Sequence, residues 1–186
     1  MHKGKKVAVV FGSSSIGEGS PHWELAVRIG REAARRGCSV ANGGYGGVME
    51  ASHKGAREVG GDAVAVVSED LGAAPNSWAS ETIVVGDWFL RFRALLEIAD
   101  VCFVLYGGLG TLNELFAAWN LVRIDKSAAP VVLVGPQWKD ALGALGIGGE
   151  AGAAPVEWRP GDGRLVTVCD TAEEAARVLD AFGAPR

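Results

Sequence analysis

The chain has 186 residues, of which 48% are hydrophobic and 22% charged, and its formal net charge is -4. A chain of this length buries roughly 70% of the surface that its unfolded form exposes, so it needs no disulfide or structural metal. Its apolar content excludes intrinsic disorder, and no apolar run approaches the about 20 residues of a membrane span. Mild acidity without a dense Lys/Arg tract argues against nucleic-acid binding. We expect one domain over residues 1–186, with neither a membrane nor a nucleic acid as partner.

Cysteine and histidine positions give no sign of a metal site. The three cysteines are isolated, which predicts reduced core residues rather than disulfides. The three histidines lack the spacing of zinc ligands, so we expect no metal and no cofactor. The basic segment Met1–Lys6 lacks the apolar stretch and cleavage site of a signal peptide, which favours the cytoplasm.

Short β-branched runs alternate with helix-like segments along the chain. The predicted strands are Lys6–Phe11, Ser39–Asn42, Asp62–Val67, Thr82–Val85, Val101–Leu105, Pro130–Val134 and Leu165–Val168. The predicted helices are Pro21–Arg36, Val48–Val59, Trp88–Ala99, Thr111–Arg123, Gln137–Leu145 and Thr171–Phe182. This alternation predicts an α/β fold: a single-domain, Rossmann-like, doubly wound parallel sheet with helices on both faces. Glu69–Ser80 and Gly146–Gly163 read as loops, the second as a surface excursion.

Glycines are concentrated where strands pass into helices. The chain has 27 of them, about twice the usual share of about 7%. Ligands of parallel sheets bind at the carboxyl ends of the strands, where the strand order switches. Three loops therefore compete for the site: Gly12–Ser20, Gly43–Gly47 and Tyr106–Thr111.

The first loop is not a dinucleotide fingerprint. The G-x-G-x-x-G spacing is absent, and the second strand ends in Ala41-Asn42 without the acidic residue that binds ribose. A Gly-Lys-Ser/Thr phosphate loop is also absent. The hydroxyls of Ser13 and Ser14 could either cap the next helix or contact a phosphate.

The third loop carries the sharpest signal. A predicted strand runs into Tyr106-Gly107-Gly108-Leu109-Gly110-Thr111 and then into a helix. Glycines let backbone amides approach an anion, and the helix N-terminus adds its positive dipole end. This pattern favours a phosphate on Gly107–Thr111, although such turns also serve tight packing alone.

Two charged side chains near this loop each allow two interpretations. Thr111-Leu112-Asn113-Glu114 is a capping-box pattern, so Glu114 either bonds to its own helix or faces a ligand. On the preceding helix, Arg91 and Arg93 flank an apolar stripe on opposite shoulders, and periodicity alone does not choose between them. The stripe consists of Trp88, Phe89, Phe92, Leu95, Leu96 and Ala99.

Gly107–Glu114 resembles the P-G-G-x-G-T-x-x-E signature of the Lonely Guy (LOG) family of cytokinin riboside 5'-monophosphate phosphoribohydrolases. Gly12–Ser14 and Gly43–Met49 are similar to two further loops of that family, so the resemblance covers about Val7 to Val134. It implies that Arg91 and Glu114 are the catalytic pair and that the protein forms a homodimer or larger homo-oligomer. The substrate-binding positions that it implies are Gly12, Ser13, Ser14, Gly44, Gly47, Met49, Gly107, Gly108, Gly110 and Thr111.

The sequence departs from the LOG pattern at two positions, and it also resembles a second family. Tyr106 stands where the signature has proline, and Phe92 stands where the cytokinin-activating members have lysine. Phe11–Gly61 also resembles the related molybdenum-cofactor carrier proteins, which bind a phosphorylated pterin. A nucleotide sensor is a weaker third possibility.

Some LOG-like proteins have carried the label lysine decarboxylase, which would require a lysine for pyridoxal phosphate. Lys54, Lys126 and Lys139 fall on predicted helices or helix edges, none of them at a strand end among the glycine loops. The pattern therefore argues against that chemistry.

The expected reaction is hydrolysis of the N-glycosidic bond of a nucleoside 5'-monophosphate. Glu114 would stabilise the oxocarbenium-like transition state or orient water, and Arg91 would hold Glu114 ionised. The apolar helix around Trp119 and Val122 could supply a subunit interface, although core packing explains these residues equally well.

Overall fold

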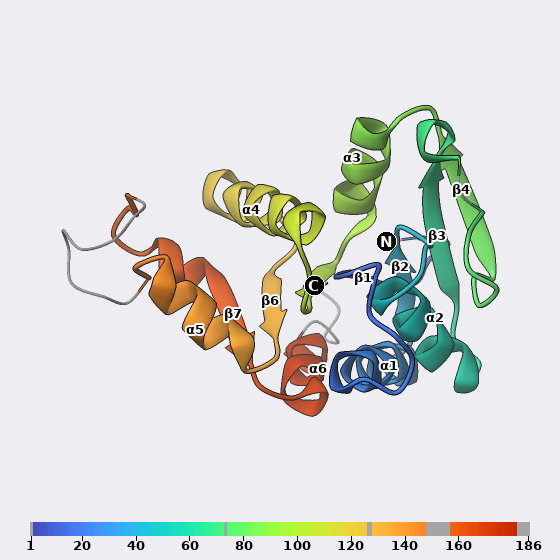
Figure 1. The fold of residues 1–186 in the computed structure, drawn as a ribbon, viewed down its shortest axis with the longest axis horizontal. Coiled ribbons are helices and arrows are strands. Elements are labelled where there is room, and N and C mark those ends of the chain that lie inside the picture. The colour runs from blue at the N-terminus through green and yellow to red at the C-terminus, as the bar shows by residue number, and fades with distance from the viewer. Residues whose placement is uncertain (1, 73, 126–127, 148–156, 182–186) are drawn as a thin grey trace.

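The computed structural model describes residues 2–72, 74–125, 128–147 and 157–181. Seven strands form one sheet in the order β4-β3-β2-β1-β5-β6-β7, and every neighbouring pair is parallel (Figure 1). The strands are β1 (Val7–Phe11), β2 (Ser39–Asn42), β3 (Ala63–Ser68), β4 (Glu81–Val85), β5 (Val101–Val104), β6 (Val131–Val134) and β7 (Val166–Cys169). The central strands are continuous apolar runs because both of their faces are buried. The predicted doubly wound α/β sheet is confirmed.

Helices cover both faces of the sheet. They are α1 (Pro21–Arg35), α2 (Val48–Glu58), α3 (Trp88–Ile98), α4 (Leu109–Ile124), α5 (Gln137–Ala144) and α6 (Ala172–Ala181). One core packs α1, α2 and α6 against the sheet, and a second core packs α3, α4 and α5 against the opposite face. Figure 1 shows α1 and α6 on one side of the strands, with α3 and α4 on the other. None of the described helices is long and apolar enough to cross a membrane.

The strand order reverses direction at β1. This strand pairs with β2 on one side and with β5 on the other, so β2, β3 and β4 extend the sheet from one edge of β1 and β5, β6 and β7 extend it from the other. Ser13 N–H, just after β1, donates to Tyr106 O, just after β5, at 2.8 Å. Val48 N–H, at the start of α2, donates to Ser13 O at 2.8 Å. The three glycine-rich loops therefore meet at this switch point, as the sequence predicts.

The α1–α2 contact depends on two helical glycines. A Cβ atom on Gly30 would lie 1.9 Å from Ser52 O, and one on Gly55 would lie 1.9 Å from Val27 O. Each glycine thus lets the backbone of the opposite helix approach to a distance that no side chain permits. This close packing supports α2, which follows the second glycine loop.

The structure differs from the prediction in the loop after β3 and in the apolar face of α3. The loop after β3 contains a 3₁₀ turn (Glu69–Leu71), and β4 follows as a half-exposed edge strand that is parallel to β3. The predicted apolar stripe of α3 is wrong at its start, because the Phe89 side chain is 74% exposed. The buried face of α3 instead carries Arg91 and Leu95, one helical turn apart.

Trp119 belongs to the core rather than to a surface. Its side chain is 4% exposed, its indole N–H donates to Asp162 O at 3.0 Å, and its ring stacks on Trp158. Val122 is a partly buried member of the same core. Of the predicted excursion over 146–163, residues 148–156 lie outside the described part of the chain, while 157–163 contact α4 through Trp158 and Asp162.

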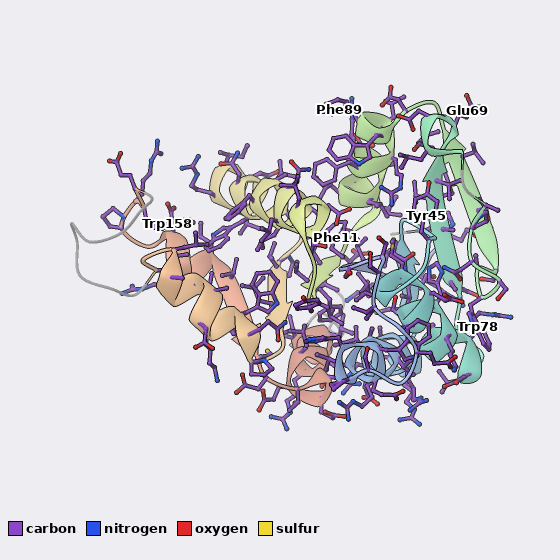
Figure 2. All side chains as sticks on the ribbon, viewed as in Figure 1. Phe11, Tyr45, Glu69, Trp78, Phe89 and Trp158 are labelled. Atoms are coloured by element: carbon purple, nitrogen blue, oxygen red, sulfur yellow. The ribbon has the colours of Figure 1, made fainter. Side chains whose placement is uncertain are left out.

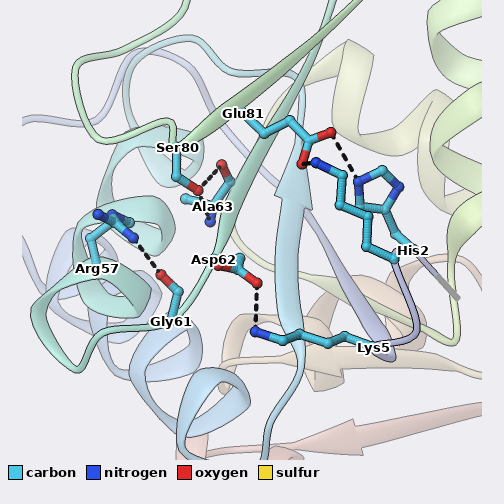
Figure 3. Close-up of polar contacts among 9 residues, drawn as sticks. His2, Lys5, Arg57, Gly61, Asp62, Ala63, Ser80 and Glu81 are labelled. Atoms are coloured by element: carbon cyan, nitrogen blue, oxygen red, sulfur yellow. Dashed lines mark hydrogen bonds and ion pairs between the residues drawn. The ribbon is translucent and has the colours of Figure 1, made fainter.

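The basic N-terminal segment is attached to the sheet edge opposite the glycine loops. Lys5 forms an ion pair with Asp62 at 2.7 Å, just before β3 (Figure 3). His2 and Lys3 both contact the carboxylate of Glu81 at the start of β4. These contacts fasten the edge strand at its amino end.

Candidate active site

A cavity of about 330 Å³ lies at the carboxyl ends of β1 and β5. All three glycine-rich loops contribute to its wall, together with the start of α3 and the first turns of α4. The predicted site residues that line it are Gly12, Ser13, Ser14, Met49, Arg91, Gly108, Gly110, Thr111 and Glu114. The fold therefore brings nine of the twelve predicted site residues to one place.

The remaining three predicted residues hold the loops together and do not line the cavity. Gly44 and Gly47 have φ of +77° and +65°, which glycine adopts at no steric cost. A Cβ on Gly47 would lie 2.2 Å from Ser13 O, and one on Gly107 would lie 2.1 Å from Thr111 Oγ1. These glycines permit the close approach of neighbouring loops, which is the packing role that the sequence left open.

Helix α4 begins two residues earlier than predicted. Gly108 precedes its first residue, and the hydrogen-bond ladder starts where Leu112 N–H donates to Gly108 O at 3.0 Å. Thr111 is therefore inside the helix, so the capping-box interpretation of Glu114 is wrong. The amides of Leu109, Gly110 and Thr111 precede the ladder and have no partner within the helix. They stand at the cavity with the positive end of the helix dipole.

The serines after β1 do not cap the next helix. Ser20 caps α1, and its side chain accepts from Trp23 N–H at 3.2 Å. Ser13 Oγ instead accepts from Ser15 N–H at 3.1 Å and folds the loop around the cavity. The structure thus excludes the capping role for Ser13 and Ser14, and both residues line the cavity.

Arg91 faces the cavity and Arg93 faces solvent. The Arg91 side chain is 5% exposed, and its Nε donates to Val66 O at 2.9 Å. Arg93 forms an exposed ion pair with Glu97, one turn along α3. The tertiary structure thus makes the choice between the two arginines that helical periodicity could not make.

Glu114 is a half-buried carboxyl group on the second turn of α4. Among the described residues it makes no hydrogen bond or ion pair, and it lines the same cavity as Arg91, whose charge acts on it. Burial raises the pKa of Glu114 to about 7, and the nearby Arg91 charge only partly offsets this. The expectation that Arg91 holds Glu114 ionised is therefore wrong in its net result. Near pH 7 the group populates both protonation states, as a general acid or base requires.

Several cavity residues carry no signal in the sequence. Tyr45, Leu71 and Trp88 come from three different connections and form an apolar part of the wall. Asn76 lies behind the second loop, where its side-chain amide donates to Gly44 O and Tyr45 O, both at 3.0 Å. Tyr45 belongs to the second glycine loop, whereas Leu71, Asn76 and Trp88 reach this region through the chain's path from β3 to α3.

The structure shows where the side chains of Tyr106 and Phe92, the two departures from the LOG signature, lie. Tyr106 stacks on His22 with ring centroids 4.2 Å apart, which attaches the third loop to the start of α1. Phe92 lines a separate groove of about 440 Å³ between α3 and α4, so its side chain does not face the cavity that Arg91 lines. Phe92, in place of the lysine of the LOG signature, therefore takes no charge away from the wall of the cavity.

The lysines considered for pyridoxal phosphate lie elsewhere. Lys54 pairs with Glu18 and Lys139 pairs with Asp170, both at the surface, and Lys126 lies outside the described residues. No lysine is among the residues that line the cavity within the described part of the chain.

Fold and cavity together define a Rossmann-like α/β protein with a cavity at the switch point of a parallel sheet, the place where such sheets bind their ligands. Within that class, the sequence model of the SLOG cluster4 family matches residues 5–137. The chain therefore belongs to the SLOG cluster4 family. Every residue of the cavity wall falls inside the matched segment.

Named relatives agree with this assignment. A cytokinin riboside 5'-monophosphate phosphoribohydrolase of Mycobacterium tuberculosis is 34% identical over 116 residues, which is 61% of this chain and 62% of that protein. The protein of the same name from Rhodococcoides fascians is 30% identical over 133 residues, which is 69% of this chain and 67% of that protein. These relatives support a hydrolase family.

Solved structures reproduce the whole fold. The molybdenum cofactor binding protein of Rippkaea orientalis superposes with a TM-score of 0.74 at 20% identity, covering 97% of this chain and 98% of that one. A Moco carrier protein from Chlamydomonas reinhardtii superposes with a TM-score of 0.65 at 25% identity, covering 96% and 99%. The sheet order and helix placement are thus shared with cofactor-binding proteins.

Proposed function

We propose that the protein hydrolyses the N-glycosidic bond of a nucleoside 5'-monophosphate, giving free base and ribose 5-phosphate. AMP and cytokinin riboside 5'-monophosphates are the expected substrate types. The observation that carries the proposal is that Arg91 and Glu114 share one cavity with the N-terminus of α4. The names of the M. tuberculosis and R. fascians relatives support the same reaction class.

The N-terminus of α4 is the proposed phosphate site. The amides of Leu109, Gly110 and Thr111 lack helical partners and point into the cavity with the helix dipole behind them. Ser13 and Ser14 lie opposite and supply hydroxyl donors. A 5'-phosphate held here directs the attached ribose toward the second turn of α4, where Glu114 lies.

Glu114 and Arg91 are the proposed catalytic pair. Water adds its oxygen to C1′ of the ribose while the C1′–N bond breaks, through an oxocarbenium-like transition state. Ionised Glu114 orients the water, accepts its proton and stabilises the positive charge on the sugar. The departing base takes up one proton, so the reaction consumes water alone. Arg91 positions the substrate and lowers the pKa of Glu114 from the value that burial alone would set.

A hydrolysis screen tests the proposal with a matched pair of variants. Glu114→Gln is compared with Glu97→Gln, which removes an exposed carboxylate of α3 that pairs with Arg93. AMP, other nucleoside monophosphates and isopentenyladenosine monophosphate are supplied, and free base is measured by chromatography. Wild type and Glu97→Gln release base, while Glu114→Gln loses turnover by roughly 10²–10⁴-fold and still binds nucleotide. Full turnover by Glu114→Gln contradicts the catalytic assignment.

A phosphate-binding carrier is the second candidate, because the structural neighbours of the whole chain include a Moco carrier protein at 25% identity. The same amides at α4 would bind the phosphate of a pterin cofactor or nucleotide without turnover. This candidate predicts that nucleotides raise the melting temperature while no substrate yields base. It also predicts that natively purified protein carries a pterin.

We further propose that the protein forms a homodimer through α3 and α4. Figure 2 shows Phe89 projecting outward from the start of α3. The side chains of Phe89 and Leu109 are 74% and 86% exposed, and Leu90, Leu112 and Phe116 on the same two helices are also exposed. Several large apolar side chains exposed on neighbouring elements are typical of interaction sites. A mass of two chains by light scattering, reduced to one by Phe89→Glu, is expected; a monomeric wild type overturns the proposal.

A further inference from the structure

The guanidinium of Arg91 lies in a slot made by the second glycine loop. A Cβ atom on Gly43 would lie 1.5 Å from Arg91 Nη2, so only a hydrogen atom fits on that side. The Tyr45 ring lies on another side, with its centroid 5.2 Å from Arg91 Cζ, and Val66 O accepts from Nε. The cavity is the open side of this slot. Arg91 has no ion pair among the described residues, so these contacts fix its orientation.

The loop that carries Tyr45 is itself held from behind. Gly44 N–H donates to Asn42 Oδ1 at 2.7 Å, and Asn76 N–H donates to Gly44 O at 2.6 Å. The Asn76 side chain adds a hydrogen bond to Tyr45 O at 3.0 Å. The backbone on both sides of Tyr45 is therefore fixed, and its ring is a rigid surface for a cation.

The ring of Tyr45 contributes more to this arrangement than its hydroxyl does. Tyr45 Oη is buried and has no hydrogen-bond partner among the described residues. A buried hydroxyl without a partner costs stability, so it does not explain the position of the side chain. A cation over an aromatic face within about 6 Å is attracted by the ring quadrupole, and the attraction is larger away from water.

We propose that Tyr45 is a positioning residue, whose ring holds the Arg91 guanidinium so that its remaining N–H groups face the ligand. The inference rests on the proposed function in that Arg91 acts on the bound nucleotide. Nothing in the LOG-like motifs of the sequence singles out Tyr45, because its role follows from the contact between the second glycine loop and α3, which are far apart in the chain.

The test separates the ring from the hydroxyl. Tyr45→Phe keeps kcat within about twofold of wild type, because the aromatic face remains. Tyr45→Leu lowers kcat roughly tenfold or more, the size of one desolvated cation–π contact. The double variant Tyr45→Leu/Arg91→Ala is no slower than Arg91→Ala alone, since both changes remove the same interaction. Trp78→Leu removes an aromatic ring at the outer edge of the molecule and serves as the control (Figure 2).

Wild-type kcat in folded Tyr45→Leu, or losses that add in the double variant, overturns the positioning role. Tyr45→Met replaces Tyr45→Leu if the latter does not fold. The pH profile gives a readout that a general packing defect would not move. Arg91 of α3 is the charged group that acts on Glu114, and Glu114 in turn raises the pKa of the buried Cys102 thiol of β5. Displacement of Arg91 in Tyr45→Leu moves the Glu114 midpoint to higher pH.

Failure of the proposed function is distinguishable from failure of this inference. If wild type releases no base, the hydrolase proposal fails, and the role of Tyr45 is then measured with AMP binding. Tyr45→Leu weakens AMP binding roughly tenfold and Tyr45→Phe does not, if Arg91 is positioned by the ring. Equal AMP affinity in wild type and Tyr45→Leu overturns the inference without reference to turnover.

Discussion

Gly43→Ala tests the link between the second glycine loop and the proposed catalytic pair. The added methyl group would lie 1.5 Å from Arg91 Nη2, whereas ordinary contact requires about 3.5 Å. The guanidinium must therefore retreat by about 2 Å. Its 2.9 Å hydrogen bond from Nε to Val66 O does not survive such a shift. The clash falls on the end of a flexible side chain and spares the backbone.

The expected result is a large effect on turnover and a small one on stability. Misplacement of a catalytic group by about 1 Å can cost about 10²-fold, so kcat falls by at least that factor. Loss of one hydrogen bond from a charged donor costs about 1.5–3 kcal/mol, partly offset by the lower chain entropy of alanine. The melting temperature consequently falls by about 1–10 °C, at roughly 2–4 °C per kcal/mol.

The pH dependence of turnover shows in which direction the retreat of Arg91 shifts the pKa of Glu114. The Arg91 charge lowers the pKa of Glu114, so its retreat lets the pKa rise further above about 7. The rising limb of the kcat profile, which follows ionisation of Glu114, moves to higher pH. Gly46→Ala is the control in the same loop, because its methyl group would meet nothing nearer than Ser14 O at 3.3 Å. A folded Gly43→Ala protein with wild-type kcat and an unchanged midpoint refutes this account of Arg91.

Three further predictions concern stability. Burial raises the pKa of Glu114 to about 7 from its ordinary 4.5, so folding is favoured by the protonated form and loses stability as pH rises from 4.5 through 7. Urea unfolding of Glu114→Gln should match wild type at pH 4 and exceed it at pH 8 by on the order of 2–3 kcal/mol; equal curves at both pH values contradict the raised pKa. Gly30→Ala should lose about 1–3 kcal/mol, because its methyl group meets Ser52 O at 1.9 Å. Gly143→Ala on α5, with open space around it, should gain roughly 0.5–1 kcal/mol in the same assay.

The fold class followed from the sequence because its signals are local. Continuous apolar runs such as Val7–Phe11 and Val101–Val104 are typical of strands buried on both faces, and they lie at the centre of the sheet. Pro21 begins α1 and Gly37, with φ of +77°, follows its end, as their backbone preferences predict. The glycine loops were placed correctly since ligand sites of parallel sheets lie at strand carboxyl ends.

The candidate site was only partly determined by the sequence. Thr111-x-x-Glu114 fits a capping box, in which Thr111 would precede the helix. In the structure Gly108 holds that position and α4 begins at Leu109, so Glu114 lies within the helix and lines the cavity. Arg91 and Arg93 are equivalent in helical periodicity. Their burial differs because the second glycine loop packs against one shoulder of α3 alone.

The sequence by itself determined the alternation of strands and helices, the three loops and the residue types that could bind a phosphate. The LOG-like signature already implied Arg91, whereas only the tertiary structure decided that Tyr45 and Trp88 line the cavity and that the net effect on Glu114 is a raised pKa. The physical reason is that periodicity records one element's own preference for burial. Desolvation and contact distance depend instead on which distant segments share a cavity, and these are set by the packing of the whole sheet.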